Sequence, residues 1–402
     1  MSEAPRKPLI PLDEALAALL AQIQPLAGRE TLATSAAVGR VLAADLISPV
    51  DVPPADNSAM DGYALRAADA GQALPVTQRI PAGSVPAPLP PGEAARIFTG
   101  AHVPPGADTV VMQEFTELVG DKVSMTQPIT AGANVRLRGE DVRAGSVVLP
   151  AGTRLDAVSV GLAATAGAAE LTVTRRPRVA LFSTGDELVM PGEPLPPGAI
   201  YNSNRFTLRT LLESLGCEVI DLGIVPDRLD ATRAALREAA SQADVILTSG
   251  GVSVGEEDHL RPAVQAEGQL DLWAIAIKPG KPFAYGRVGA AHFIGLPGNP
   301  VSSLVTFLVL VRPFLLKLQG AARLTPRGYR LAAGFDWPKP DKRREFLRVR
   351  LDEEGGLAMF SNQSSGVLTS AFWADGLLDN PPGQAFKAGD AVRFIPFAEL
   401  LA

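Results

Sequence analysis

Residues 249–258 have the sequence SGGVSVGEED, and they follow the apolar run DVILT at residues 244–248. A short apolar run that ends at glycine is typical of a buried strand followed by a tight turn. Two further glycine-rich segments, KPGKP at residues 278–282 and GLPGNP at residues 295–300, also follow apolar runs. In a parallel sheet such turns share one edge, where main-chain N–H groups bind phosphates. The three segments therefore predict an α/β domain with an anion-binding edge.

The residues around these segments alternate between strand and helix patterns. This alternation predicts a parallel sheet that is covered by helices on both faces, within residues 177–326. Proline follows Asn299, which places it at the first position of a long helix. Strands are predicted at residues 178–182, 218–222, 244–248 and 275–277, and helices at residues 208–215, 230–240 and from 299 onward.

Three other parts of the chain have different patterns. Several domains are expected, because a chain of 402 residues is too long for a single hydrophobic core. Residues 48–145 contain short strand patterns between glycine and proline turns, which predict a β-rich inserted domain. Residues 1–47 and 146–176 each contain a helix pattern, and we expect them to form one discontinuous, dimerising domain around that insertion. Residues 327–402 predict a C-terminal β domain, in which residues 344–351 and 357–360 form a hairpin around a turn at 353–356.

The composition excludes several classes of protein. A net charge of −6 disfavours a nucleic-acid-binding protein, which needs a basic face. The single cysteine, Cys217, excludes an internal disulfide and a cysteine-rich metal centre. The apolar run 301–318 contains Arg312 and Pro313, so we expect a buried helix rather than a membrane span. The first residues contain no apolar signal core, and we therefore expect a cytoplasmic protein without a membrane partner.

Carboxylates occur at the predicted anion-binding edge. Asp258 ends the first glycine-rich segment, and Glu187 lies in the sequence TGDEL, which follows another predicted strand. Mg²⁺ prefers such oxygen ligands together with substrate oxygens. The same residues also suit a tight turn in which Asp258 or Asp186 caps a helix, so the pattern alone leaves both alternatives open.

Lysines occur at the same edge. Lys278 and Lys281 flank a Pro-Gly pair, and two fixed ammonium groups suit an oxyanion or a phosphate. The segment 297–300 adds the unpaired N–H groups of a helix start. The β-rich part contributes three polar loops, at residues 57–64, 98–101 and 136–141.

Together, and in this order, these segments resemble the molybdopterin molybdenumtransferase family, which includes bacterial MoeA and the E domain of gephyrin. The resemblance extends over nearly the whole chain. It depends on the sequences SAMDGYA at 58–64, FTG at 98–100, GED at 139–141, STGDEL at 183–188, SGGVSVGEED at 249–258, KPGKP at 278–282 and LPGNP at 296–300.

The resemblance implies a fold and an assembly. The expected fold is multidomain α/β plus β, with a central three-layer α/β molybdopterin-binding (MogA-like) domain and a parallel-rich sheet. A β-rich inserted domain and a C-terminal β-barrel-like domain complete it. The implied assembly is an elongated homodimer, with the active cleft between the α/β domain of one subunit and the β-rich domain of the other.

The resemblance also implies a reaction and its residues. Adenylylated molybdopterin and molybdate yield the molybdenum cofactor, and AMP is released in a step that depends on Mg²⁺. The implied catalytic residues are Asp61, Thr99, Glu187 and Asp141, and the implied metal ligands are Asp258 and Glu187. The implied substrate-binding residues are Gly250, Gly251, Ser253, Gly255, Lys278, Lys281, Pro297, Gly298, Asn299, Pro300, Asp227, Arg348 and Ser365.

The chain departs from the family at Ala274, where a lysine is common. Losing that cation bears on anion affinity and on the choice between molybdate and tungstate, unless Arg205 compensates. Two other functions stay open from the sequence. The chain could adenylylate molybdopterin from ATP, or it could be a non-catalytic scaffold of the gephyrin type. A molybdopterin adenylyltransferase is a possible docking partner.

Overall fold

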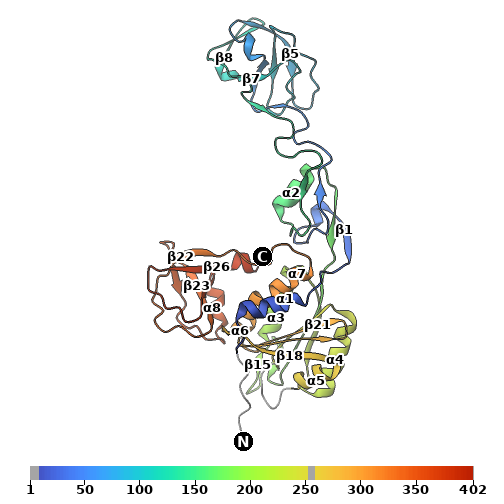
Figure 1. Cartoon of the computed structure of the whole chain (residues 1–402), viewed down its shortest axis with the longest axis vertical. Coiled ribbons are helices and arrows are strands. Elements are labelled where there is room, and N and C mark those ends of the chain that lie inside the picture. The colour runs from blue at the N-terminus through green and yellow to red at the C-terminus, as the bar shows by residue number, and fades with distance from the viewer. Residues whose placement is uncertain (1–8, 252–258, 402) are drawn as a thin grey trace.

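The computed structural model describes residues 9–251 and 259–401, and it shows an elongated molecule (Figure 1). The β-rich part lies at one end, and a narrow middle part with α2 (Ala157–Thr165) connects it to the remainder. The α/β domain and the C-terminal β domain lie side by side at the other end. The β-rich part is therefore distant from the α/β domain of its own chain.

The α/β domain is built on a six-stranded mixed sheet. Four neighbouring strands, β16, β13, β17 and β21, run parallel to one another, whereas β20 is antiparallel to both of its neighbours. The order across the sheet is β16 (Glu218–Val225), β13 (Arg178–Thr184), β17 (Val245–Ser249), β21 (Ala291–Leu296), β20 (Pro282–Val288) and β18 (Gly268–Ala274).

Helices cover both faces of this sheet because its central strands are apolar on both sides. Within β13, Val179 and Leu181 pack on one face, and Ala180 and Phe182 pack on the other. Together with the sheet, the helices form the expected three layers. The first face is covered by α1 (Leu12–Ala21), α3 (Ser203–Ser214), α6 (Pro300–Thr306) and α7 (Arg312–Leu318), and the second by α4 (Leu229–Gln242) and α5 (Leu260–Glu267).

The strand predicted at residues 275–277 is wrong. The strand is β18, which ends at Ala274, whereas Ile277–Lys278 forms the short β19 and pairs with β23 (Arg344–Leu351) of the C-terminal domain. β18 is an edge strand with polar residues on one face, as in Gln269 and Asp271, so it lacks the continuous apolar run of a central strand.

The long apolar helix is part of the core. α6 and α7 are joined by a π-helical segment, Phe307–Val311, so that residues 300–318 form one continuous helical rod. Among the described residues, only this helix is long and apolar enough to cross a membrane, and 89% of its most apolar window is buried inside the fold. Its apolar surface therefore packs against the sheet and α1.

The middle part is held together by strands from both sides of the inserted residues. β1 (Arg29–Ala33) pairs antiparallel with β12 (Glu170–Thr174), and β2 (Leu46–Ile47) pairs with β11 (Val147–Leu149). The β-rich part between them contains its own curled six-stranded sheet. The order of that sheet is β7 (Thr109–Met112), β4 (Gly62–Leu65), β6 (Ala94–Ile97), β5 (Leu74–Ile80), β9 (Lys122–Met125) and β8 (Thr116–Val119).

The C-terminal domain is a second β structure, which packs against α6 and α7. The hairpin of β23 and β24 (Leu357–Met359) occurs where the sequence predicts it, with Leu351 opposite Leu357. The remaining elements are β22 (Tyr329–Ala332), β25 (Gly376–Asn380), β26 (Ala391–Pro396), α8 (Leu368–Trp373) and α9 (Phe397–Leu400).

Candidate active site

A cleft with a volume of about 420 Å³ lies at the carboxyl edge of the parallel strands. Thr184 and Ser249 reach it from the ends of β13 and β17, and the turn after β21 closes one side. The short strands β14 (Leu188–Val189) and β15 (Ile200–Tyr201) form the opposite rim. Among the sequence-predicted residues, the cleft is lined by Glu187, Gly250, Pro297, Gly298, Asn299 and Pro300.

The glycine pair after β17 permits a close approach of main chains. Gly250 and Gly251 have φ angles of 90° and 64°, which favour glycine. A Cβ on Gly250 would lie 3.0 Å from the carbonyl oxygen of Thr184, and the N–H of Gly250 donates to the carbonyl of Leu296 at 3.0 Å. The turn thus fills the space between β13 and β21. The predicted residues Ser253, Gly255 and Asp258 lie outside the described residues.

The start of α6 is held by contacts from two directions. Asn204 donates from Nδ2 to the carbonyl of Gly298 at 2.7 Å, and this bond fixes the turn before the helix. The N–H of Val301 donates to the carbonyl of Ser365 at 2.9 Å, so a loop of the C-terminal domain satisfies one donor of the first helical turn. Ser365 therefore borders the helix start, but it is not among the residues that line the cleft.

Asp186 and Glu187 form a turn directly before β14, so the alternative of a helix with Asp186 as its cap is wrong. The carboxylate of Glu187 folds back over Gly185, since a Cβ there would lie 2.6 Å from Oε2. Burial raises the pKa of the Asp227 carboxyl; the charge of His259 opposes this shift, whereas Asp186 and Glu187 add to it. Like charges are therefore gathered at this edge of the sheet.

This group of carboxylates suits a hard cation. Mg²⁺ takes oxygen ligands and is commonly bound through one or two carboxylates, which Glu187 and Asp227 supply. The described residues by themselves contain no group of three or more His, Cys, Asp or Glu side chains placed to bind a metal ion. A complete site would also need substrate oxygens or Asp258.

The two lysines have different surroundings. Lys278 Nζ lies 3.2 Å from Oε1 of Glu345, which is 0% exposed, and 3.7 Å from Oδ2 of Asp341. Lys281 is exposed and forms no ion pair with the described residues. Lys278 therefore neutralises carboxylates of the C-terminal domain, and Lys281 can offer its full charge to a ligand.

Position 274 is alanine, and in the described residues Arg205 does not supply a free cation in its place. Arg205 is the only replacement that the sequence suggests, and its Nε donates to Asp221 at 2.9 and 3.0 Å. Because this carboxylate neutralises Arg205, Arg205 does not add a free positive charge to the cleft.

Arg348 lies behind the cleft and is 1% exposed. Its guanidinium donates to the Ser370 hydroxyl at 3.1 Å and to the carbonyls of Phe346 and Ser364 at 3.1 and 3.3 Å. Burial lowers its pKa to about 10. In this conformation Arg348 positions the loop that ends at Ser365.

Asp61 and Thr99 meet in the β-rich domain. Oδ1 of Asp61 accepts hydrogen bonds of 2.7 Å from both the N–H and the Oγ1 hydroxyl of Thr99. These two bonds hold the pKa of the Asp61 carboxyl below its usual range, with a smaller contribution from Arg96. Both residues are exposed, so the Asp61 carboxylate is accessible on the surface of the β-rich domain.

Asp141 lies at the base of the β-rich domain, where its N–H donates to the carbonyl of Val52 at 3.0 Å. Its side chain is exposed. Figure 1 places this domain at the opposite end of the molecule from the cleft. One chain therefore brings Asp61 and Thr99 together, and separately gathers Glu187 and Asp227, but it does not bring these two groups together.

Sequence reasoning missed Asn202 and Asn204, which line the cleft. Asn202 caps α3 by accepting from the N–H of Arg205, and its buried Nδ2 has no hydrogen-bond partner among the described residues. A buried amide without a partner, on the wall of a cleft, is suited to a ligand oxygen. The sequence YNSN before a helical pattern was the available signal, but it is also typical of an ordinary helix cap.

Three family models match successive parts of the chain. The MoeA N-terminal region (domains I and II) matches residues 10–167, a probable molybdopterin-binding domain matches residues 180–317, and the MoeA C-terminal region (domain IV) matches residues 330–397.

Relatives match over the full length. A molybdopterin molybdenumtransferase of Haemophilus influenzae is 42% identical, covering 98% of this chain and 100% of the relative. Molybdopterin molybdenumtransferase 2 of Mycobacterium tuberculosis is 39% identical over 87% of this chain and 90% of its own. The crystal structure of a molybdopterin biosynthesis moeA protein from Pyrococcus horikoshii superposes with a TM-score of 0.84 at 31% identity, covering 97% of this chain and 100% of that chain.

The expected fold class is confirmed by these matches and by the layers described above. The match to transferases over their whole length, rather than over the α/β domain alone, favours the first of the three functions considered from the sequence. The chain belongs to the molybdopterin molybdenumtransferase family, and it is a transferase of molybdenum cofactor biosynthesis.

Proposed function

We propose that this transferase inserts molybdate into adenylylated molybdopterin and releases AMP in a step that depends on Mg²⁺. We further propose that it acts as a cytoplasmic homodimer. Each active site would combine the cleft of one subunit with the Asp61–Thr99 pair of the other. The observation that carries the proposal is the separation of these two groups within one chain.

The cleft supports the binding of an adenylyl phosphate. The glycine turn at 250–251 and the start of α6 both line the cleft at the carboxyl edge of the sheet, the usual ligand-binding edge of an α/β fold. The N–H groups of Gly250 and Val301 already donate to the carbonyls of Leu296 and Ser365, so side chains supply the polar contacts to the phosphate. Lys281, which forms no ion pair with the described residues, adds a positive charge near this edge, since it directly precedes β20. The unpartnered amide of Asn202 supplies a further polar contact on the cleft wall.

Glu187, Asp227 and Asp258 are the residues that would hold Mg²⁺. When bound, the cation neutralises negative charge on the phosphate as its bond to the departing AMP breaks. Burial is the main cause of the raised pKa of Asp227, and Asp186 and Glu187 contribute less; a bound cation would lower the cost of keeping this carboxyl ionised.

Asp61 and Thr99 would approach the pterin and molybdate end of the substrate. Two hydrogen bonds keep Asp61 ionised and fix its orientation, so the carboxylate can accept a proton or a hydrogen bond without rearranging. The dithiolate of the substrate supplies sulfur ligands for molybdenum, so the site has no need of cysteine. The only cysteine, Cys217, is buried.

Mixing two inactive variants tests the shared site. Asp61→Asn and Glu187→Gln should each abolish cofactor formation as homodimers. In a heterodimer of the two, one of the two sites recovers both wild-type residues, so an equilibrated mixture should regain about a quarter of wild-type activity. AMP release and cofactor formation are measured after unfolding and refolding the variants together.

Two outcomes count against the proposal. A mixture in which heterodimers are demonstrated by mass spectrometry, yet which stays inactive, contradicts the shared site. Release of AMP at the same rate in EDTA and in Mg²⁺ contradicts the metal dependence.

Docking of a molybdopterin adenylyltransferase is part of the proposal, and a shift in sedimentation of the mixed proteins would support it.

A further inference from the structure

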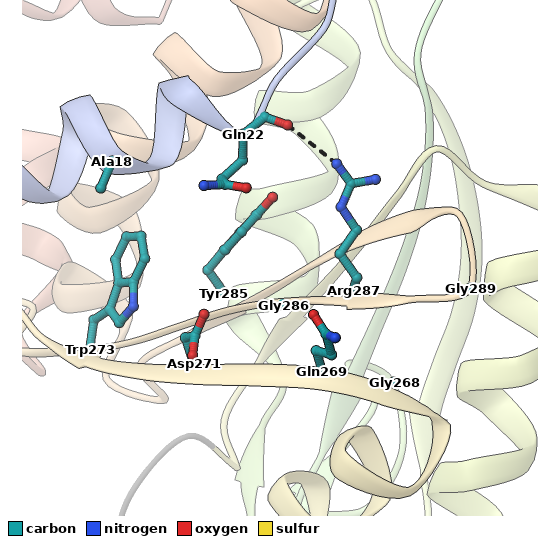
Figure 2. Close-up of a pocket in the computed structure, with 10 residues that line it drawn as sticks. All are labelled: Ala18, Gln22, Gly268, Gln269, Asp271, Trp273, Tyr285, Gly286, Arg287 and Gly289. Atoms are coloured by element: carbon teal, nitrogen blue, oxygen red, sulfur yellow. Dashed lines mark hydrogen bonds between the residues drawn. The ribbon is translucent and has the colours of Figure 1, made fainter.

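A second cavity, with a volume of about 500 Å³, lies between the end of α1 and the edge hairpin of β18 and β20 (Figure 2). It shares none of its lining residues with the catalytic cleft. Ala18 and Gln22 approach from α1, and the other lining residues belong to the hairpin.

The hairpin faces this cavity with polar side chains. Strand register places Gln269 opposite Arg287 and Asp271 opposite Tyr285, and Figure 2 shows these side chains on the same side of the hairpin. This is the side on which α1 packs, where a strand that only served the core would carry apolar residues. The polar pattern of β18 therefore has no explanation in packing.

An aromatic platform borders the cavity. The ring centroids of Trp273 and Tyr285 are 5.9 Å apart, and Tyr285 is only 5% exposed. The Tyr285 hydroxyl lies 2.8 Å from Nδ1 of His292, a buried imidazole whose pKa is lowered to about 4 by burial. The imidazole is therefore neutral at pH 7 and can accept that bond, which fixes the Tyr285 ring.

Opposite charges face the cavity without pairing with each other. Arg287 donates to main-chain carbonyls of Gln22 and Ala290, at 3.2 and 3.3 Å, and so is held in place by neutral acceptors. Asp271 is exposed toward the cavity and forms no salt bridge within the described part of the chain. A donor and an acceptor, both charged, are thus presented beside a fixed aromatic surface.

We propose that this cavity binds a 2-amino-4-oxopyrimidine ring, the ring that guanine and pterins share. Such a ring presents an N–H and an adjacent amino group, which the Asp271 carboxylate accepts as a pair. Its carbonyl oxygen accepts from Arg287, and its face stacks on Trp273. The cavity volume lies within the usual range of about 300–1,000 Å³ for small-molecule sites.

Calorimetric titration of the full-length protein with small rings tests the assignment. Guanosine and unsubstituted pterin are the two probes, and they distinguish the two sources of the ring. Two nucleosides are the controls. Inosine lacks the amino group, and adenosine lacks the combination of ring N–H, adjacent amino group and carbonyl. We expect at least one probe to bind in this cavity, at one site per chain, and pterin can occupy a second site in the catalytic cleft. We expect inosine to bind about tenfold more weakly than guanosine, because it loses a hydrogen bond to a charged group.

Variants separate this cavity from the catalytic cleft, which also accepts pterins under the proposed function. Asp271→Asn should weaken binding at least about tenfold, whereas Asp121→Asn, which removes the same charge from an exposed turn, should not. Glu187→Gln should leave ring binding unchanged and abolish only the transfer reaction.

Three results would overturn the inference. The first is the absence of binding by both guanosine and pterin at millimolar concentration. The second is binding that is lost in Glu187→Gln but kept in Asp271→Asn, which assigns it to the cleft. The third is equal affinity for guanosine and adenosine, which shows stacking without recognition of the ring edge.

Discussion

Thr99 donates two hydrogen bonds to a single oxygen of Asp61, from its main-chain N–H and from its hydroxyl, each 2.7 Å long. The bonds join two loops that are 38 positions apart in sequence. They are possible because Gly62 and Ile97, the neighbouring strand residues, are paired across β4 and β6. A sheet register thus sets the ionisation of a candidate catalytic carboxylate.

Replacing Thr99 by valine should raise the pKa of Asp61 toward its ordinary value, because the hydroxyl donor is lost while the N–H remains. As the pH is lowered, the Thr99→Val variant should therefore lose activity at a higher pH than the wild type does. Carbon-detected NMR titration of Asp61 measures the shift directly. Thr99→Ser keeps the hydroxyl and is the control. An unchanged pKa of Asp61 in Thr99→Val would show that the Thr99 hydroxyl does not influence the ionisation of Asp61.

Gly62→Ala should destabilise the protein by about 3 kcal/mol, since the added Cβ would lie 1.8 Å from the carbonyl oxygen of Val111 and the strands would have to separate. The matched control is Gly71→Ala in the same domain, where nothing lies within 4 Å. Chemical denaturation measures both variants. Equal stability of the two alanine variants would show that the close approach of β4 and β7 is not required.

His292 should make stability depend on pH. Burial lowers the pKa of its imidazole to about 4; Arg287 contributes in the same direction and Asp244 opposes them. Because the folded pKa lies below the ordinary 6.5, the unfolded chain takes up the proton first as the pH falls. The contribution of His292 to the free energy of unfolding is therefore complete above about pH 6.5, and it decreases by about 3 kcal/mol as the pH falls toward 4.

Replacement of His292 by glutamine should remove most of that decrease. The measurement is the free energy of unfolding at several pH values between 4 and 7, in both proteins. A wild-type slope that survives unchanged in His292→Gln would assign the pH dependence to other groups.

The two lysines should respond differently to removal. Lys278→Ala leaves the fully buried Glu345 without its cation, so it should lower stability by about 1–2 kcal/mol in addition to lowering activity. Lys281→Ala should lower activity and leave the unfolding temperature unchanged, because that side chain is exposed. Thermal unfolding and cofactor formation are measured for both variants. A stable but inactive Lys278→Ala would show that Lys278 acts only on substrate.

Much of the candidate site follows from short local patterns. The glycine turn at 250–251 and Pro300 at the first position of α6 depend on main-chain preferences that a few neighbouring residues fix. The same holds for the hairpin of β23 and β24. Family motifs added Asp61 and Thr99 as catalytic residues, which no local pattern indicates, and the structure added the hydrogen bonds between them.

Long-range contacts account for what the sequence did not show. The strand expected at residues 275–277 is wrong because Ile277 and Lys278 pair with β23, more than sixty positions away. Lys278 and Lys281 look equivalent in the sequence, yet only Lys278 contacts the buried Glu345. Asn202 and Asn204 became cleft residues only when α3 was placed beside the turn at Gly298.

The amino-acid sequence by itself determined the family, the alternation of strands and helices, and the turns at the sheet edge, because each depends on side chains close together in the chain. The tertiary structure decided which charges are neutralised, which side chains face a cavity, and that the β-rich domain lies at the opposite end of the molecule from the α/β domain. Those properties depend on burial and on contacts between distant segments, and the packing of whole domains sets both.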